Sequence, residues 1–132
     1  MQLSIQQART VAQDTMAAVG HTAQESAVIA DHLIDCELRG LSYGGLPRAL
    51  SIAEHIRSGG VERRPIAVLR ESAVSASLDG GEQVGYLVAN RAVDMAIAKA
   101  RETGLAVVGA SKTWYTGMFS YYLERITKAG FV

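Results

Sequence analysis

The spacing of the apolar residues changes near residue 60, and this change constrains the fold more than any other feature of the chain. Before it, apolar residues recur at helical spacing, as in the stripe formed by Ala27, Ala30, Ile34 and Leu38. After it, apolar and polar residues alternate from Val74 to Asp79, which indicates a half-buried strand. We therefore expect an α/β (α+β) chain, with a helical segment over 1–60 and an α/β segment over 61–132.

Three helices are expected in the first segment, over residues 4–19, 22–40 and 47–57. Thr22 is followed three positions later by Glu25, a capping-box pattern that fixes the start of the second helix. Pro47 suits the first turn of the third helix, where its missing N–H is not needed. The glycines between these helices predict a loop over 41–45.

The second segment predicts a mixture of strands and helices. Residues 66–69 form a short apolar run. We expect strands over 74–79 and 105–109, the second of them buried, a turn at 79–81, and helices over 84–103 and 118–129. Phe131 and Val132 resemble the start of a further strand, and a strand needs roughly five residues and a partner. The sequence therefore predicts the front portion of a longer polypeptide.

Charge and cysteine content exclude several classes of protein. Thirteen basic residues balance thirteen acidic ones, so the chain has no electrostatic footprint for nucleic acid or an anionic membrane. No apolar stretch approaches the ~20 residues of a spanning helix, and the N-terminus lacks a signal-peptide pattern. Cys36 is the single cysteine, which favours a reducing compartment. We expect a cytoplasmic protein that binds neither nucleic acid nor membranes.

Metal binding is not expected from the histidines and the cysteine. His32 and Cys36 lie four residues apart on one predicted helix, but a zinc site would need further ligands from elsewhere. We interpret them as a surface histidine and a partly buried thiol. His21 and His55 are interpreted as structural or solvated residues.

A phosphate-binding loop is also disfavoured. The glycines of Gly80-Gly81-x-x-x-Gly85 precede a helix, whose N–H groups could hold a phosphate. Asp79 and Glu82 beside them are acidic and argue against an anion. A plain strand-to-helix turn is the favoured interpretation.

Two other loops carry the candidate site residues. Arg48 falls in the first turn of a predicted helix, where a cation opposes the helix dipole. It is either a solvated arginine or the ligand of an anion such as a substrate carboxylate. In the loop over 112–117, Trp114 and Tyr115 follow a strand and precede a helix, where ligands often bind in α/β proteins. They either line a pocket or cover a neighbouring helix or subunit.

Short motifs in these regions resemble a known family. They are Ala30-Asp31-His32-Leu33, Arg39-Gly40, Arg57-Ser58-Gly59-Gly60, Leu78-Asp79-Gly80-Gly81, the helix end Lys99-Ala100-Arg101-Glu102-Thr103-Gly104, Val107-Val108-Gly109, and Gly117 to Tyr122. In this order and spacing they resemble the malate/L-lactate dehydrogenase-like NAD(P)-dependent oxidoreductases, which are not Rossmann proteins. Relatives in that family include ureidoglycolate dehydrogenase, sulfolactate dehydrogenase and Δ1-piperideine-2-carboxylate reductase.

The resemblance implies hydride transfer between NADPH or NADH and a small carboxylate substrate, either a 2-oxo/2-hydroxy acid or a cyclic imino acid. It also implies a homodimer, and an unusual, mostly antiparallel nicotinamide-binding domain that this chain begins but does not complete. By the same resemblance, Gly45 and Arg48 contact substrate, and Thr116 and Gly117 contact the cofactor.

The chain departs from the family at both loops. The family loop "S-H-G-x-x-R" reads Tyr43-Gly44-Gly45-Leu46-Pro47-Arg48 here, so Gly44 replaces the histidine assigned to catalysis. In the second loop Tyr115 stands where the family has another histidine. Because glycine cannot transfer a proton, Tyr43 or Tyr115 is the candidate catalytic donor. An iminium substrate would depend less on such a donor, so the departure favours an imine reductase or an enzyme with an otherwise atypical substrate. The alternative is a degenerate, non-catalytic binding or assembly module.

Overall fold

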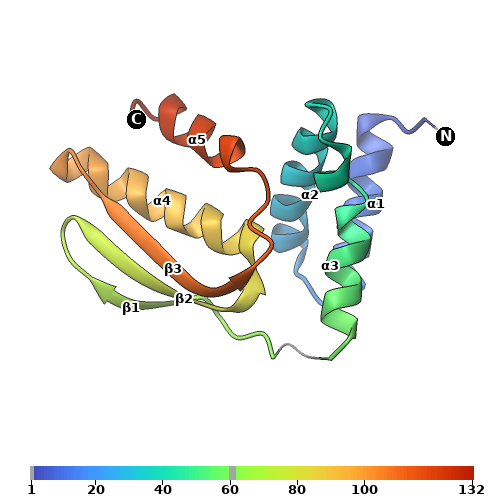
Figure 1. The fold of residues 1–132 in the computed structure, drawn as a ribbon, viewed down its shortest axis with the longest axis horizontal. Coiled ribbons are helices and arrows are strands. Elements are labelled where there is room, and N and C mark those ends of the chain that lie inside the picture. The colour runs from blue at the N-terminus through green and yellow to red at the C-terminus, as the bar shows by residue number, and fades with distance from the viewer. Residues whose placement is uncertain (1, 60–61) are drawn as a thin grey trace. The chain divides into compact units, whose positions relative to one another are not determined.

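The computed structural model describes residues 2–59 and 62–132, and the chain divides into two compact units, Met1–Glu62 and Arg63–Val132. The first unit contains α1 (Ile5–Ala17), α2 (Ala23–Leu38), the short 3-10 helix η1 (Ser42–Gly44) and α3 (Arg48–Arg57), as Figure 1 shows. The second contains β1 (Ala67–Glu71), β2 (Ser75–Val84), α4 (Gly85–Thr103), β3 (Val107–Trp114) and α5 (Phe119–Lys128).

Local capping explains where the helices of the first unit begin. The Ser4 hydroxyl accepts the N–H of Gln7, and the Gln7 side chain accepts the N–H of Ser4. Thr22 and Glu25 form the same reciprocal pair, which confirms the predicted capping box. Each pair satisfies two N–H groups that would otherwise lack a partner inside the helix.

The core of the first unit lies where α1, α2 and α3 meet. Its fully buried side chains include Met16, Ile29, Leu33 and Ile52. The predicted stripe on α2 is therefore partly wrong, because Leu38 is 65% exposed while Ile29 and Leu33 occupy the core. Because α2 contacts both α1 and η1, its buried side chains cover a wider sector of the helix than a single stripe.

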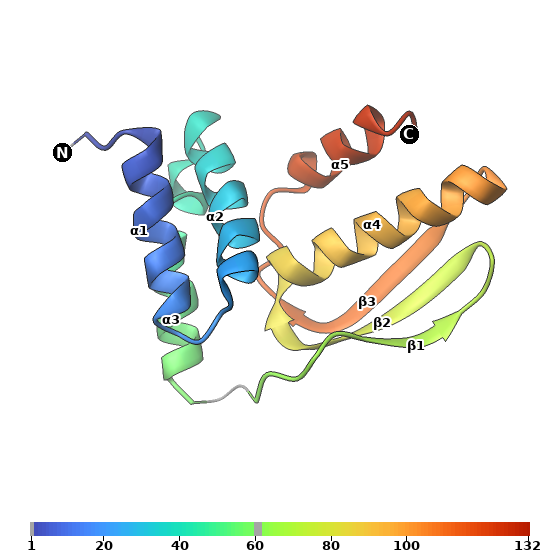
Figure 2. The same cartoon turned by 180° about the vertical axis from the view of Figure 1, so that it is seen from behind.

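The second unit is a three-stranded sheet with strand order β1-β2-β3, and α4 packs against it (Figure 2). The β1 and β2 strands pair antiparallel, whereas β2 and β3 pair parallel through the crossover helix α4. Leu78, Val84 and Val88 are buried, so the core of this unit lies between β2 and α4. Arg125 of α5 donates to Asn90 and Asp94 of α4, which ties the last helix to the same layer.

Two predictions in this unit are corrected. The expected turn at 79–81 is an irregularity inside β2, because the pairing with β3 shifts between Asp79 and Gln83 and Gly81 has a left-handed φ of 63°. The expected buried strand over 105–109 is instead β3, which extends to Trp114 and has Val107 65% exposed. It is exposed because it forms an edge of the sheet.

The last helix, α5, spans Phe119–Lys128, and Phe131 and Val132 follow it without regular secondary structure. Among the described residues, no helix is both long and apolar enough to cross a lipid bilayer.

Candidate functional site

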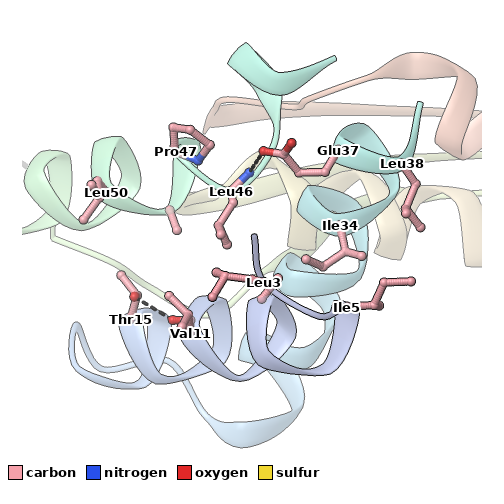
Figure 3. Close-up of a pocket in the computed structure, with 12 residues that line it drawn as sticks. Leu3, Ile5, Val11, Thr15, Ile34, Glu37, Leu38, Leu46, Pro47 and Leu50 are labelled. Carbon is pink, nitrogen blue, oxygen red and sulfur yellow. Dashed lines mark hydrogen bonds between the residues drawn. The ribbon is translucent and has the colours of Figure 1, made fainter. Parts of the chain in front are cut away.

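The segment 43–48 is held against α2 by a carboxylate. The backbone N–H of Leu46 donates to the Glu37 side chain at 2.7 Å, which Figure 3 shows as a dashed line. A Cβ placed on Gly45 would lie 2.3 Å from the same carboxylate oxygen. Glycine is therefore required at 45 for this approach, because any larger residue would displace the Glu37 side chain.

Arg48 and Tyr43 contact each other within this segment. Arg48 is the first residue of α3, it is half-buried, and its guanidinium donates to the Tyr43 carbonyl at 3.4 Å. The Tyr43 side chain extends into solvent, with 78% of the residue exposed. A guanidinium carries five donors in a planar fork that matches a carboxylate. The geometry thus suits Arg48 to anion binding and leaves Tyr43 accessible.

An apolar groove of about 670 Å³ lies beside this segment, between α1, α2 and the start of α3 (Figure 3). Its walls include Leu3, Val11, Leu46 and Leu50, and the charged group among the described residues that line it is the Glu37 carboxylate. A carboxylate would repel a carboxylate substrate. We therefore do not place the reaction in this groove.

The segment 112–117 belongs to the second unit and holds a strained backbone. Lys112 and Tyr115 have φ angles of 52° and 50°, in the left-handed region that residues with side chains rarely adopt. Lys112 lies within β3 and not in the expected loop, which begins after Trp114. Strain of this kind persists only where neighbouring contacts fix it, and it concentrates at functional sites.

Hydrogen bonds from side chains to backbone carbonyls fix this segment. The Trp114 indole donates to the Glu82 carbonyl at 3.0 Å, and the Thr113 hydroxyl donates to the Gln83 carbonyl at 2.9 Å. These two bonds tie the end of β3 to β2. The Trp114 and Tyr115 rings meet edge to face with centroids 5.3 Å apart, and Tyr115 remains 43% exposed. The Tyr115 phenol is therefore accessible although its backbone is fixed.

The two residues predicted to bind the cofactor, Thr116 and Gly117, come next in the chain. Thr116 is half-buried, and Gly117 has a left-handed φ of 76° that favours glycine. The segment 43–48 and the segment 112–117 belong to different units.

The glycines at 80 and 81 do not form a phosphate cradle. The Asp79 carboxylate accepts the Gly81 N–H at 2.8 Å and pairs with Lys112 and Arg64 at 3.1 and 3.3 Å. The backbone N–H of Gly81 and, next, the Lys112 ammonium lower the pKa of Asp79 below its usual value. The Asp79 carboxylate therefore occupies the position that a phosphate would take at the Gly81 N–H.

His32 is buried and not on the surface, which corrects the sequence interpretation. It has no exposed area, and burial lowers its pKa from 6.5 to about 4, partly opposed by Asp35. Burial and the Asp35 charge raise the pKa of the Cys36 thiol, so it is not an activated nucleophile. Among the described residues, no group of three or more histidine, cysteine or carboxylate side chains is placed to hold a metal ion.

The other two histidines differ in environment. His21 is buried, and its Nδ1 lies 3.7 Å from the Glu25 carboxylate at the start of α2. His55 is half-buried in the last turn of α3. Both positions agree with the structural or solvated interpretation.

Sequence reasoning missed two residues that hold the candidate segments. Glu37 carries an anion in the last turn of α2, where the helix dipole disfavours it. The argument that singled out Arg48 at a helix start would have found Glu37 as well. Tyr122, whose hydroxyl donates to the Thr116 carbonyl at 2.7 Å, gave no comparable signal because its partner is a backbone atom.

Comparison with known proteins identifies a family. A family model described as malate/L-lactate dehydrogenase matches residues 3–132. The chain is 33% identical over 115 residues to a malate dehydrogenase of Pyrococcus abyssi, covering 86% of this chain and 32% of that protein. It is 29% identical to the ureidoglycolate dehydrogenase (NAD(+)) of Escherichia coli, covering 100% of this chain and 38% of that protein.

A solved structure agrees with these sequence matches. The malate dehydrogenase of Pyrococcus horikoshii superimposes with a TM-score of 0.93 at 29% identity, over 98% of this chain and 38% of that one. The chain thus has the fold of the front part of that enzyme. It spans between about a third and two fifths of the length of the relatives named here.

Proposed function

The chain belongs to the malate/L-lactate dehydrogenase family, and we propose that it contributes to an NAD(P)H-dependent reductase or dehydrogenase of a small carboxylate. The substrate is a 2-oxo/2-hydroxy acid or a cyclic imino acid. The names of the relatives support this class, because they include dehydrogenases of malate and ureidoglycolate, one of which is named for NAD(+).

The observation that carries the proposal is the setting of Arg48. A guanidinium at the start of α3 opposes the helix dipole, which costs about 0.3–1 kcal/mol unless an anion offsets it. A substrate carboxylate is such an anion, and a bidentate pair would also orient it. Gly45, three residues earlier, carries no side chain that would obstruct the approach.

A phenol supplies the proton in this proposal. When bound, the nicotinamide supplies a hydride to the carbonyl carbon. The carbonyl electron pair moves to oxygen, which takes the proton of Tyr115 or Tyr43 and becomes a hydroxyl. The phenolate is then reprotonated from solvent. Tyr115 and Tyr43 are both exposed enough to reach a substrate, and Gly44 has no proton to give.

Thr116 and Gly117 would hold the cofactor. The sharp left-handed turn at Tyr115 and Gly117 exposes backbone at this point, and Gly117 has no side chain to obstruct a flat ring. The residues present therefore fit a nicotinamide.

Full-length protein assayed for oxidation of NADH and of NADPH tests the proposal. The panel contains 2-oxo acids, cyclic imino acids and the matched amides that lack the carboxylate. We expect turnover with a carboxylate substrate, and about 100-fold lower kcat/KM for Arg48→Ala, since a lost charged hydrogen-bonded contact is worth about 1.5–3 kcal/mol. Arg57→Ala, at the exposed far end of α3, is the control. Equal kcat/KM for wild type and Arg48→Ala would contradict the role of Arg48.

A second candidate function is a non-catalytic binding or assembly module. It is favoured by one observation, that Gly44 and Tyr115 stand where the family has histidines. Titration of full-length protein into NADPH, followed by cofactor fluorescence, separates the two. No change at saturating protein would favour the module.

A further inference from the structure

We infer that Tyr122 is a positioning residue for Tyr115, acting through the backbone carbonyl of Thr116. The inference rests on the proposed function, because it concerns the segment that carries a candidate proton donor. Tyr122 is 5% exposed in α5, and its hydroxyl donates to the Thr116 carbonyl at 2.7 Å. That carbonyl lies one residue beyond the strained Tyr115, whose φ is 50°.

A second contact also restrains Thr116. A Cβ placed on Gly85, at the start of α4, would lie 2.7 Å from the Thr116 Cα and 2.9 Å from its backbone nitrogen. The backbone of Thr116 is therefore pressed against α4 where a side chain is absent. The Tyr122 hydroxyl of α5 binds the carbonyl of the same residue. The Thr116 peptide is therefore restrained by both α4 and α5.

The third fixed point is Trp114, whose indole donates to the Glu82 carbonyl at 3.0 Å. Tyr115 thus lies between two residues that are each hydrogen-bonded to a different element. A left-handed φ at a residue with a side chain persists only if the surroundings impose it. Trp114 restrains the backbone on the N-terminal side of Tyr115. We assign the restraint on its C-terminal side to Tyr122, because the Tyr122 hydroxyl binds the Thr116 carbonyl.

The consequence is kinetic. A proton donor must lie within hydrogen-bond reach of the developing hydroxyl, and a displacement of about 1 Å can lower the rate 100-fold. Loss of the Tyr122 hydroxyl would release the Thr116 peptide and let Tyr115 relax. Carboxylate binding by Arg48 would not change, because Arg48 belongs to the other unit and makes its contact with Tyr43.

The test compares Tyr122→Phe with Tyr121→Phe in full-length protein. Phenylalanine keeps the ring in place and removes only the hydroxyl, and Tyr121 is the adjacent, half-buried tyrosine of the same helix. Hydrogen exchange measured by mass spectrometry follows peptides that cover residues 115–118. Steady-state kinetics with the carboxylate substrate follow kcat and KM separately.

We expect Tyr122→Phe to speed exchange over 115–118 about fivefold, which is the loss of one hydrogen bond of ordinary strength. We expect kcat to fall about tenfold with KM for the carboxylate unchanged. Tyr121→Phe should change neither. Unaltered exchange in Tyr122→Phe overturns the positioning role whatever the activity.

Faster exchange with unaltered kcat overturns the link to Tyr115. The proposed function fails separately, if wild-type protein turns over no carboxylate substrate with either cofactor. In that event the exchange measurement still decides whether Tyr122 fixes the segment.

Discussion

The two candidate segments are held in opposite ways. The segment 43–48 is fixed by an acceptor, the Glu37 carboxylate, which binds the N–H of Leu46. The segment 112–117 is fixed by donors, the hydroxyl of Tyr122 and the indole of Trp114, which bind carbonyls. No described residue from 43 to 48 has a left-handed φ, whereas Lys112 and Tyr115 both do.

Under the proposed function, this difference suits one segment to substrate binding and the other to proton donation. A relaxed segment that carries a guanidinium can adjust to the shape of a carboxylate, because a long flexible side chain makes the contact. A strained segment fixed on both sides cannot adjust, and it offers the preorganisation that proton transfer needs. Under the proposed function, we therefore expect Arg48 of the first segment to bind the substrate carboxylate and Tyr115 of the second to donate the proton.

Removing the hydroxyls of Tyr115 and Tyr43 in turn is the most direct test of these two roles, and it has the largest expected effect. Tyr115→Phe should lower kcat for a 2-oxo acid about 100-fold, because general acid catalysis contributes roughly 10²–10⁴-fold. Tyr43→Phe should change kcat less than threefold, because Tyr43 is 78% exposed on the relaxed segment. Single-turnover measurements of NADPH oxidation give the chemical step directly.

The reverse order of losses would exchange the roles of the two segments. If neither variant loses activity on a 2-oxo acid, the proton comes from elsewhere. A cyclic imino acid supplies an internal control, since an iminium carries its own proton and should be insensitive to Tyr115→Phe.

Acid should weaken the two units in different pH ranges. Buried His32 has its pKa lowered from 6.5 to about 4, so the unfolded chain binds more protons between these values. Stability of the first unit is then greatest above pH 6.5 and falls as the pH drops towards 4, by about 3 kcal/mol in all. In the second unit the pKa of Asp79 is lowered below 3.8, so its contribution is lost only at lower pH.

Urea unfolding of full-length protein at pH 7, 5.5 and 4, with amide exchange to separate α2 from β2, measures this difference. His32→Gln is the matched variant, because glutamine does not titrate in this range. In this variant the stability of α2 should change little between pH 6.5 and 4. If α2 and β2 lose stability over the same pH range, and His32→Gln does not change this, His32 is not the cause.

Much of the fold could be predicted because its signals are local. The capping box of Thr22 and Glu25 depends on a few adjacent residues, and the structure confirms it; Pro47 likewise marks the start of α3, as its N-cap and not within its first turn. The irregularity at Gly81 could not be predicted, because it follows from the register between β2 and β3. Burial of His32 likewise depends on which face of α2 meets its neighbours, and a polar residue gives no warning of that.

The candidate site divides in the same manner. Arg48 could be found because its charge conflicts with the position in the helix, a property of the sequence alone. The support of Tyr115 by Tyr122 could not be found, since the two are seven positions apart and the bond ends on the carbonyl of Thr116. Hydrogen bonds from side chains to distant backbone carry no pattern in sequence, so the positioning contacts appear only in three dimensions.

Gly85→Ala tests the strained segment by adding one methyl group. The new Cβ would lie 2.7 Å from the Thr116 Cα, which is backbone and cannot turn aside. We expect a loss of about 2 kcal/mol in the free energy of unfolding, the typical cost of overpacking. Gly109→Ala on β3 is the control, because nothing lies within 4 Å of its Cβ position. Equal effects of the two variants would show that Thr116 is not pressed on α4.

Gly45→Ala makes the same change in the relaxed segment, and its effect should be smaller. Its Cβ would lie 2.3 Å from the Glu37 carboxylate, which is the end of a flexible side chain and can swing away. The loss is then the hydrogen bond to Leu46, about 1 kcal/mol. Gly44→Ala, whose Cβ would meet the Cys36 sulfur at an ordinary 3.8 Å, is the control.

A double-mutant cycle with Glu37→Ala decides whether the Glu37 carboxylate causes the loss of stability in Gly45→Ala. In the Glu37→Ala background the obstacle and the hydrogen bond are both gone, so Gly45→Ala should change the free energy of unfolding by less than about 0.5 kcal/mol. An undiminished cost in that background would mean that backbone, and not a side chain, limits the space at Gly45. The first segment would then be as rigid as the second, and the division between a compliant binding segment and a preorganised catalytic one would have no structural basis.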